Sequence, residues 1–419
     1  MSDLFWPGDE RAGALFADSA LLEGMVALEA AWSAGLVAHG LAPRGVAVSA
    51  DELLELLDGS DVARIVLDAE GGGNPVIPLV STLRNRLVEA GREETAQWLH
   101  QGLSSQDVVD TALMLCAGTA LRRLEIELGT QAQALDALAG AHRGTVMVGR
   151  TLTQHAVPIT FGLKASGWLA GIEDARASVA FAHSVLPAQV GGAAGTLAVT
   201  VELARRRGLR DPEGATVALA RETAAALGLV PAAPWHTTRF PVTRVGDALA
   251  TASSAMGRIA SDVLTLTRPE IAEVAEPLGT GRGGSSTIPQ KQNPVLAVLV
   301  RRAAITAPGL AGTLHTAAAF ANDERPDGAW HAEWATLRDL ARRTVVAAAH
   351  TSELVAGLQV DVVAMRERAR AAGALLAERD AVRGLVEVAG TGGENAADDG
   401  GPSSYLGITD QIVQNRTRP

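Results

Sequence analysis

The spacing of apolar residues along the chain predicts long helices. Apolar positions recur at helical intervals around residues 20–39 and 49–57, and again over residues 76–99. The pattern then runs from Asp107 to about Arg143 without a proline, and it returns over residues 164–184, 242–267, 294–320 and about 333–358. Because such lengths exceed the usual three or four turns, we expect a bundle of extended helices.

Glycine, proline and short polar runs divide this helical pattern into parts. Residues 71–75 interrupt the first part, and the polar run over residues 101–107 gives a first boundary. The last 60 residues read as shorter helices, a Gly/Asp-rich stretch from Gly390 to Pro402 and an amphipathic piece over residues 404–413. We therefore expect an all-α protein with three helical domains: residues 1–105, a central long-helix bundle over residues 106–350, and a small C-terminal domain over residues 351–419.

Composition favours closely packed helices over strands. Of the 419 residues, 47% are hydrophobic but only 3% are aromatic, and small side chains let helices approach one another. Long helices of this kind carry broad stripes of Ala, Leu and Val that must be buried. Association into a homo-oligomer is the ordinary way to bury them, so we expect an obligate oligomer.

Charge and cysteine content narrow the class of partner and the compartment. The net charge is −11 and there is no basic block, which argues against nucleic-acid and membrane partners. Cys116 is the only cysteine, so no intrachain disulfide can form, and its apolar neighbours predict a buried, inert thiol. The first residues lack the basic and apolar regions of a signal peptide, and no run of about 20 apolar residues is apparent. We expect a cytoplasmic protein.

Histidines and cysteines do not occur at metal-ligand spacing. The sequence contains no His-x-x-x-His or Cys-x-x-Cys, and neither His142 nor His155 has a second ligand at a suitable interval. We therefore expect no metal and no other cofactor.

The segment Gly283–Pro294, GGSSTIPQKQNP, carries the strongest chemical signal in the chain. Ser285 and Ser286 follow a glycine hinge, and Lys291 and Asn293 come after a proline. Such a loop can close over an anionic substrate and place an oxygen acid or base beside a cation. The chemistry that it suggests is proton transfer at a carbon alpha to a carboxylate.

Three other interpretations of this loop are weaker. Gly/Ser/Thr/Pro clusters often form plain surface linkers, but this one is more specified than a linker requires. Gly279, Gly281 and Gly284 match the dinucleotide pattern GxGxxG, yet that pattern needs a strand before it and a helix directly after it. The hydrolase elbow Gly-x-Ser-x-Gly is absent, because Thr287 stands at its last position.

Two further polar segments lie between apolar helices. Residues 99–107 carry His100, Ser104, Ser105 and Gln106 at an expected helix start, where free backbone N–H groups favour an anion. A plain cap, with Ser105 or Asp107 as N-cap, explains the same residues.

In the second segment, residues 149–158, Thr151 and Gln154 can orient a carboxylate. An interhelical polar contact before a kink at Pro158 is the alternative.

These three segments, in this order, resemble the fumarase/aspartase superfamily. Its signature, Gly-Ser-Ser-x-Met-Pro-x-Lys-x-Asn-Pro, matches residues 284–294 with Ile288 at the methionine position. The resemblance extends from about Gly72 to Asp410. It implies a homotetramer whose central helices form one bundle and whose active sites are each built by several subunits.

The sequence departs from the pattern of the superfamily's lyases at two places, and both departures are typical of one branch of the superfamily. Lyases carry Gly-Arg-Thr-His, whereas Leu152 stands at the histidine position here, and their Lys-His-Asp run is missing near residues 73–79. Both departures resemble the 3-carboxy-cis,cis-muconate cycloisomerases, as do residues 105–108, 160–162, 234–239, 330–334 and 405–407. Gln290 and Gln292 differ from the His and Arg that are most common in that branch. A carboxylate leaving group needs no acid, which gives a physical reason for Leu152.

The resemblance implies lactonisation of a small tricarboxylate, with Ser285, or else Ser286, giving a proton to the alpha carbon. It further implies that Lys291 and Asn293 hold the carboxylate on which charge develops. The remaining carboxylates would be bound by Ser104, Ser105, Gln106, Thr151 and Gln154, with His100 and Arg239 as further candidates. Two alternatives stay open: a substituted-succinate lyase of the adenylosuccinate or nitrosuccinate type, which releases fumarate, and a non-catalytic helical scaffold.

Overall fold

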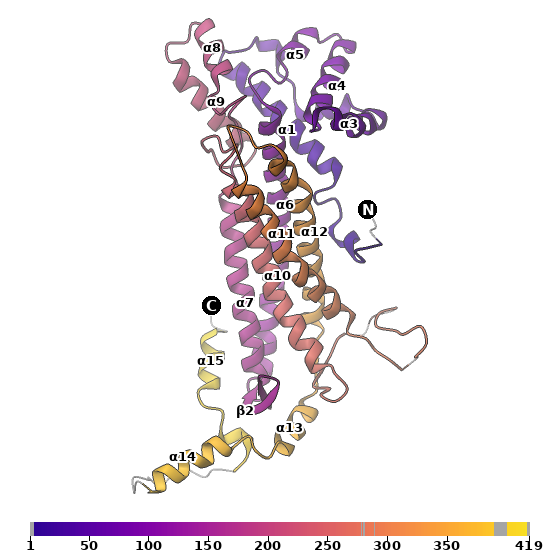
Figure 1. Ribbon diagram of the computed structural model, residues 1–419, viewed down its shortest axis with the longest axis vertical. Helices are drawn as coiled ribbons and strands as arrows, with labels where there is room; N and C mark the ends of the chain where they lie inside the picture. The colour runs from indigo at the N-terminus through magenta and orange to yellow at the C-terminus, as the bar shows by residue number, and fades with distance from the viewer. Residues whose placement is uncertain (1–3, 278, 280, 289, 389–399, 417–419) are drawn as a thin grey trace. The chain divides into compact units, whose positions relative to one another are not determined.

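A computed structural model describes residues 4–277, 279, 281–288, 290–388 and 400–416 (Figure 1). The chain divides into two compact units, each made of three segments. Unit 1 comprises Met1–Arg123, Val179–Ala250 and Pro308–Val345, and unit 2 comprises Leu124–Ser178, Thr251–Ala307 and Val346–Pro419. The three-domain division expected from the sequence stays a prediction beside this one.

Five long helices contribute residues to both units. They are α6 (Ser105–Ala141), α7 (Phe161–Ser184), α10 (Phe240–Leu266), α11 (Val295–Ala319) and α12 (Gly328–Ala356). Close packing of these helices depends on small residues: in unit 1 a Cβ added to Gly246 would lie 2.6 Å from Leu314 Cδ1. The all-α class and the long helices expected from the apolar spacing are confirmed.

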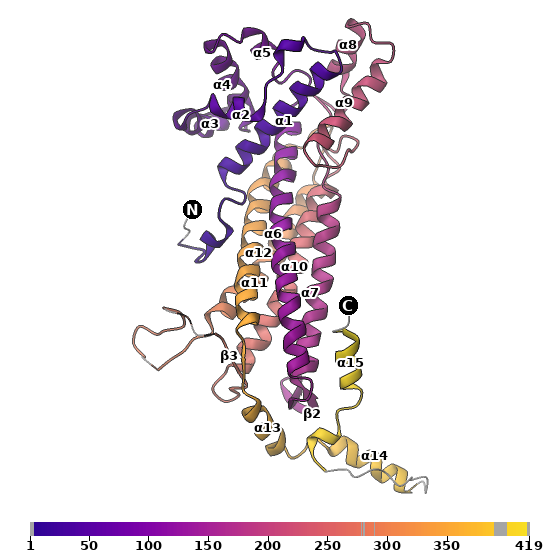
Figure 2. The same cartoon turned by 180° about the vertical axis from the view of Figure 1, so that it is seen from behind.

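Helix α1 and several shorter helices complete unit 1. They are α1 (Asp18–Ala38), α2 (Ala50–Glu55), α3 (Gly59–Gly72), α4 (Val76–Glu89), α5 (Glu93–Trp98), α8 (Ala198–Arg206) and α9 (Pro212–Ala226), with 3-10 turns at Asp9–Ala12 and Arg44–Val46. Helix α1 packs against α2 and α9, and α9 packs against α8 (Figure 2). Capping side chains define several starts, such as Ser49 for α2, Asp58 for α3 and Asp211 for α9.

Unit 2 adds two small antiparallel sheets to its helices. Strands β1 (Val146–Thr151) and β2 (Gln154–Thr160) form a hairpin, and β3 (Val274–Ala275) pairs with β4 (Gln359–Val360). Helix α13 (Val362–Ala371) packs against β1, and α14 (Ala377–Val388), a 3-10 turn at Pro402–Ser404 and α15 (Thr409–Arg416) follow. The interhelical contact before Pro158 is therefore wrong, because Pro158 lies within β2 opposite Val148.

Helices α1 and α11 are long and apolar enough to cross a membrane when length and composition alone are considered. From the sequence we expected no apolar segment long enough to cross a membrane. Core helices of soluble proteins meet the same criterion, so the observation is weak evidence for a membrane span.

Candidate active site

The polar segment before α6 is a helix cap, and its N-cap is Ser104. The Ser104 N–H donates to Asp107 Oδ2 (2.8 Å), and the Asp107 N–H donates to Ser104 Oγ (3.3 Å). This reciprocal pair is a capping box, so Ser105 is the first helical residue and Asp107 occupies the third position. The alternative caps, Ser105 and Asp107, are therefore wrong. Ser104 is buried and Ser105 is half-buried.

Asp107 and Gln106 turn toward the interior of unit 1. Asp107 also accepts hydrogen bonds from the Gly191 and Gly192 N–H groups, both at 2.9 Å, and lies 3.1 Å from His236 Nε2. Gln106 Nε2 donates to the His236 carbonyl (2.9 Å), and the side chain is fully buried. The substrate-binding role of Gln106 stays a prediction.

Arg239 is the centre of a buried ion network in unit 1. Its guanidinium donates to Asp110 (2.7 and 2.9 Å) and to Glu333 (2.5 Å), and it lies over the Trp235 ring at 4.8 Å. Burial disfavours the charged form, but the two carboxylates outweigh it and raise the pKa of Arg239. Burial also raises the pKa of Glu333, an effect that Arg239 opposes. The guanidinium of Arg239 already donates hydrogen bonds to both carboxylates. The substrate-binding role of Arg239 stays a prediction.

His100 lies in the same segment and has a partner that the sequence analysis missed. Its Nδ1 is 2.6 Å from Oε1 of Glu29, a fully buried carboxylate on α1. The signal in the sequence was an acidic residue within the largely apolar second half of α1, but its partner lies 71 positions away.

The β1–β2 hairpin carries the second predicted segment at its tip. Leu152 and Thr153 form the turn with φ values of 46° and 70°, and the Leu152 side chain is 96% exposed. Thr151 and Gln154, which flank the turn, are also exposed. Below the tip, Arg150 donates to both oxygens of the buried Glu273 (2.8 and 3.0 Å). The hairpin is thus tied to the segment that leads to the Ser285 loop.

The Ser285 loop is closed at its neck by Asn293. The Asn293 backbone N–H and Nδ2 both donate to the Gly283 carbonyl, at 2.8 and 3.1 Å. Gly283 has φ 75°, and a Cβ there would lie 2.9 Å from the Asn293 carbonyl oxygen, so only glycine fits this neck.

Beyond the neck, Ser285 Oγ accepts from the Ile288 N–H (3.2 Å) and is 3.4 Å from the Thr287 nitrogen. Ser286 and Lys291 are exposed, and Pro289 of the signature lies outside the described residues.

The dinucleotide interpretation of this region fails on structural context. The preceding strand, β3, has only two residues, and the next helix, α11, begins at Val295 rather than directly after Gly284. A pyrophosphate site of that type needs the helix start beside the glycines.

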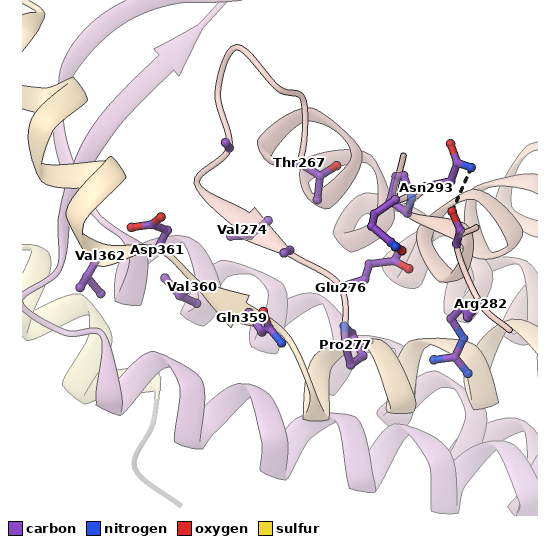
Figure 3. A pocket seen from close by; sticks show the side chains of 15 residues that line it. Thr267, Val274, Glu276, Pro277, Arg282, Asn293, Gln359, Val360, Asp361 and Val362 are labelled. Carbon is purple, nitrogen blue, oxygen red and sulfur yellow. Dashed lines mark hydrogen bonds between the residues drawn. The ribbon is translucent and has the colours of Figure 1, made fainter. Parts of the chain in front are cut away.

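A cavity of about 610 Å³ lies within unit 2 at the neck of the loop (Figure 3). Asn293 lines it, but Ser285 and Lys291 do not. Glu276 on its wall accepts hydrogen bonds from the Leu296 and Ala297 N–H groups (3.0 and 2.7 Å) at the start of α11. Burial raises the pKa of Glu276, and these hydrogen bonds oppose the shift. Glu276 therefore ties the wall of the cavity to the start of α11.

The predicted site residues fall into two groups. Unit 1 holds His100, Ser104, Ser105, Gln106 and Arg239, and unit 2 holds Thr151, Gln154, Ser285, Ser286, Lys291 and Asn293. Four residues of the unit 2 group, Ser285, Ser286, Lys291 and Asn293, lie on one loop. The segment that precedes this loop is bound to the hairpin by the Arg150–Glu273 ion pair. Over the described part of the chain, no group of three or more His, Cys, Asp or Glu side chains could hold a metal.

Comparison with known proteins defines the class. Residues 18–309 match the family model described as "Lyase", which is well over half of the chain, so the protein belongs to this lyase family of the fumarase/aspartase superfamily. The superfamily that the sequence analysis identified is thereby confirmed.

The proteins most similar to this chain include enzymes with different activities. The chain is 43% identical to a nitrosuccinate lyase of Streptomyces davaonensis over 84% of this chain and 73% of the relative. It is 39% identical to a 3-carboxy-cis,cis-muconate cycloisomerase of Bradyrhizobium diazoefficiens over 86% of this chain and 77% of the relative. Among solved structures, the 3-carboxy-cis,cis-muconate lactonizing enzyme of Pseudomonas putida superposes with a TM-score of 0.82 at 30% identity, covering 97% of this chain and 96% of that one.

Proposed function

We propose that the protein converts 3-carboxy-cis,cis-muconate to 4-carboxymuconolactone. The observation that carries this proposal is Leu152, an apolar side chain where the Gly-Arg-Thr-His lyases of the superfamily have a histidine. An alkyl group cannot donate a proton, so the site fits a reaction whose leaving group departs as a stable anion. The similarity to cycloisomerases and to the lactonizing enzyme supports the same activity.

Ring closure needs one proton and one new bond. A substrate carboxylate oxygen adds to the carbon beta to a second carboxylate, and the electron pair of that double bond moves into the second carboxylate to give an aci-carboxylate. Ser285 then gives its hydroxyl proton to the alpha carbon, which restores the carboxylate. The reverse reaction is a beta-elimination in which the carboxylate leaves without protonation.

The loop geometry supports this role for Ser285. After it has given up its proton, the Ser285 oxygen carries negative charge, and the Ile288 and Thr287 N–H groups face that oxygen. Hydrogen bonds to the charged form stabilise it and make the serine a better acid. Lys291 and Asn293 then hold the carboxylate on which charge develops, and Ser286 is the substitute donor if Ser285 is not used.

The remaining carboxylates are assigned to Ser104, Ser105, Gln106, Thr151 and Gln154, with His100 and Arg239 as secondary candidates. We propose that a cytoplasmic homotetramer brings these segments together, with each site shared between subunits. The exposure of Leu152, Thr151, Gln154 and Lys291 in the single chain supports such sharing, because a working site must exclude water.

Elimination of nitrite from nitrosuccinate is the second candidate. The 43% identity to the Streptomyces davaonensis enzyme favours it. Nitrite also leaves as a stable anion, so Leu152 is compatible with this reaction too, with Ser285 taking a proton from carbon. The neutral Gln290 and Gln292 leave fewer positive charges on the loop, which suits a substrate with two carboxylates rather than three.

A substrate panel separates these functions. The purified protein is incubated in parallel with 3-carboxy-cis,cis-muconate, nitrosuccinate, adenylosuccinate and argininosuccinate, and lactone, fumarate and nitrite are quantified. We expect lactone from the first substrate at a kcat/KM at least about tenfold above that for any other. Fumarate from any of the last three without lactone would replace the proposal.

A further inference from the structure

Three consecutive residues in the segment that joins α5 to α6 each contact a side chain of α1 or α4. Arg84 of α4 donates to the Leu99 carbonyl (2.7 Å), and Trp32 of α1 donates its indole N–H to the Gln101 carbonyl (2.8 Å). Between these two anchors, Glu29 of α1 lies 2.6 Å from His100 Nδ1. Glu29 and Trp32 are three positions apart, so one face of α1 presents both to this segment.

His100 is held in a backbone conformation that costs free energy. Its φ of 64° is in the left-handed region, which residues other than glycine seldom adopt. Strain of this kind persists where surrounding contacts fix it, and it is common at functional sites. The Glu29 contact and the two flanking carbonyl anchors are the contacts that fix it here.

The environment of Glu29 shows how the pair is oriented. The Glu29 side chain has no exposed surface, and its Oε2 has no hydrogen-bond partner within the part of the chain that the structure describes. A buried carboxylate is costly unless it is paired, so Glu29 depends on the Nδ1–H of His100. With Nδ1 donating to Glu29, the second ring nitrogen, Nε2, is left for another partner. The His100 side chain is 19% exposed, so the ring remains accessible.

We propose that Glu29 is a positioning residue that acts through His100, fixing Nδ1–H so that Nε2 is available to a substrate carboxylate. The inference rests on the proposed function, in which His100, Ser104 and Ser105 bind an anionic substrate. An imidazolium donates through both ring nitrogens, so a ring held by Glu29 on one side can donate to a substrate carboxylate on the other. Glu29 itself does not touch the substrate.

A double-mutant cycle tests this coupling. Glu29→Gln keeps the shape but removes the negative charge, and His100→Gln removes the ring. We expect Glu29→Gln to raise KM about tenfold with kcat within about threefold, and to add nothing to His100→Gln. Glu23→Gln, on the exposed side of the same helix, is the matched control and should leave KM unchanged. If the effects of Glu29→Gln and His100→Gln multiply, Glu29 acts on the fold and the proposal is overturned.

A second measurement does not depend on turnover. In protein labelled with ring ¹⁵N histidine, with His100→Gln for assignment, we expect long-range proton–nitrogen correlations to show hydrogen on Nδ1 of His100. Hydrogen on Nε2 alone would overturn the positioning role whatever the substrate is. If Nδ1 carries hydrogen and no lactone forms, the proposed substrate has failed while the Glu29–His100 pair stands, and the cycle is repeated with nitrosuccinate.

Discussion

Arg150 and Glu273 form a two-pronged ion pair, with distances of 2.8 and 3.0 Å, that fastens the Leu152 hairpin to the segment before the Ser285 loop. Glu273 has no exposed surface, and the Arg150 side chain is 16% exposed. The pair therefore sets the spacing of two segments to which we assign substrate contacts.

Loss of one charge from this pair should destabilise unit 2. Glu273→Gln leaves the Arg150 guanidinium in a largely buried position without its counter-charge, which costs about 3 kcal/mol. Urea unfolding monitored by circular dichroism measures the change. The control is Glu213→Gln, which breaks an exposed pair with Arg205 and should have little effect. Equal midpoints for the two variants would contradict the anchoring role.

Arg239 is expected to matter for folding rather than for substrate affinity. Arg239→Ala leaves Asp110 and Glu333 buried together without a cation, and we expect a loss of about 3–5 kcal/mol in the free energy of unfolding. Thermal unfolding of Arg239→Ala against Arg206→Ala, an exposed arginine, measures this effect. A stable Arg239→Ala protein with a raised KM would instead make Arg239 a substrate contact.

Lys291 should affect turnover without affecting stability. Its side chain is exposed, so Lys291→Ala should fold normally, yet the loss of charge stabilisation should lower kcat about 100-fold. Lys291→Arg keeps the positive charge and should recover part of that loss. Steady-state kinetics on the three proteins decides the matter, and wild-type turnover by Lys291→Ala would remove the proposed role.

Cys116 should be inert in the native protein. Burial, aided by the negative charge of Glu23, raises the pKa of its thiol to about 12. Because the pKa is higher in the folded state than in the unfolded state, the associated stability is complete below about pH 9 and is lost as the pH rises toward 12.

Two measurements check this account of Cys116. Alkylation by iodoacetamide at pH 8 should be slow in buffer and fast in urea. The stability of Cys116→Ala should fall less steeply than that of the wild type between pH 9 and 11. Rapid alkylation of the folded protein would show that the thiol is accessible.

Sequence patterns located the long helices because their apolar periodicity extends over many turns, as in α6 and α10. They missed α3, a helix that begins and ends with glycine. The signal for its start was the capping pair Asp58 and Asp61. They also missed the β1–β2 hairpin, because its turn is made by Leu152 and Thr153 rather than by the Asn-Gly or Asp-Gly pairs that mark such turns.

The candidate site was predictable where one short segment holds the chemistry, as in the Ser285 loop. Contacts between distant positions were not predictable from local patterns. Glu29 with His100, Arg150 with Glu273, and Arg239 with Asp110 and Glu333 are separated by 71 to 129 positions. A buried polar side chain on an apolar helix face signals that it has a partner but does not identify that partner.

The central claim is that Ser285 protonates the alpha carbon during lactone formation. Its most direct test is proton NMR of 3-carboxy-cis,cis-muconate incubated with the protein in D₂O. We predict 4-carboxymuconolactone carrying one deuterium at the carbon alpha to the carboxylate, and at least about 100-fold slower formation by Ser285→Ala. Diene signals that persist with the wild-type protein, while nitrosuccinate gives fumarate and nitrite, would contradict the claim.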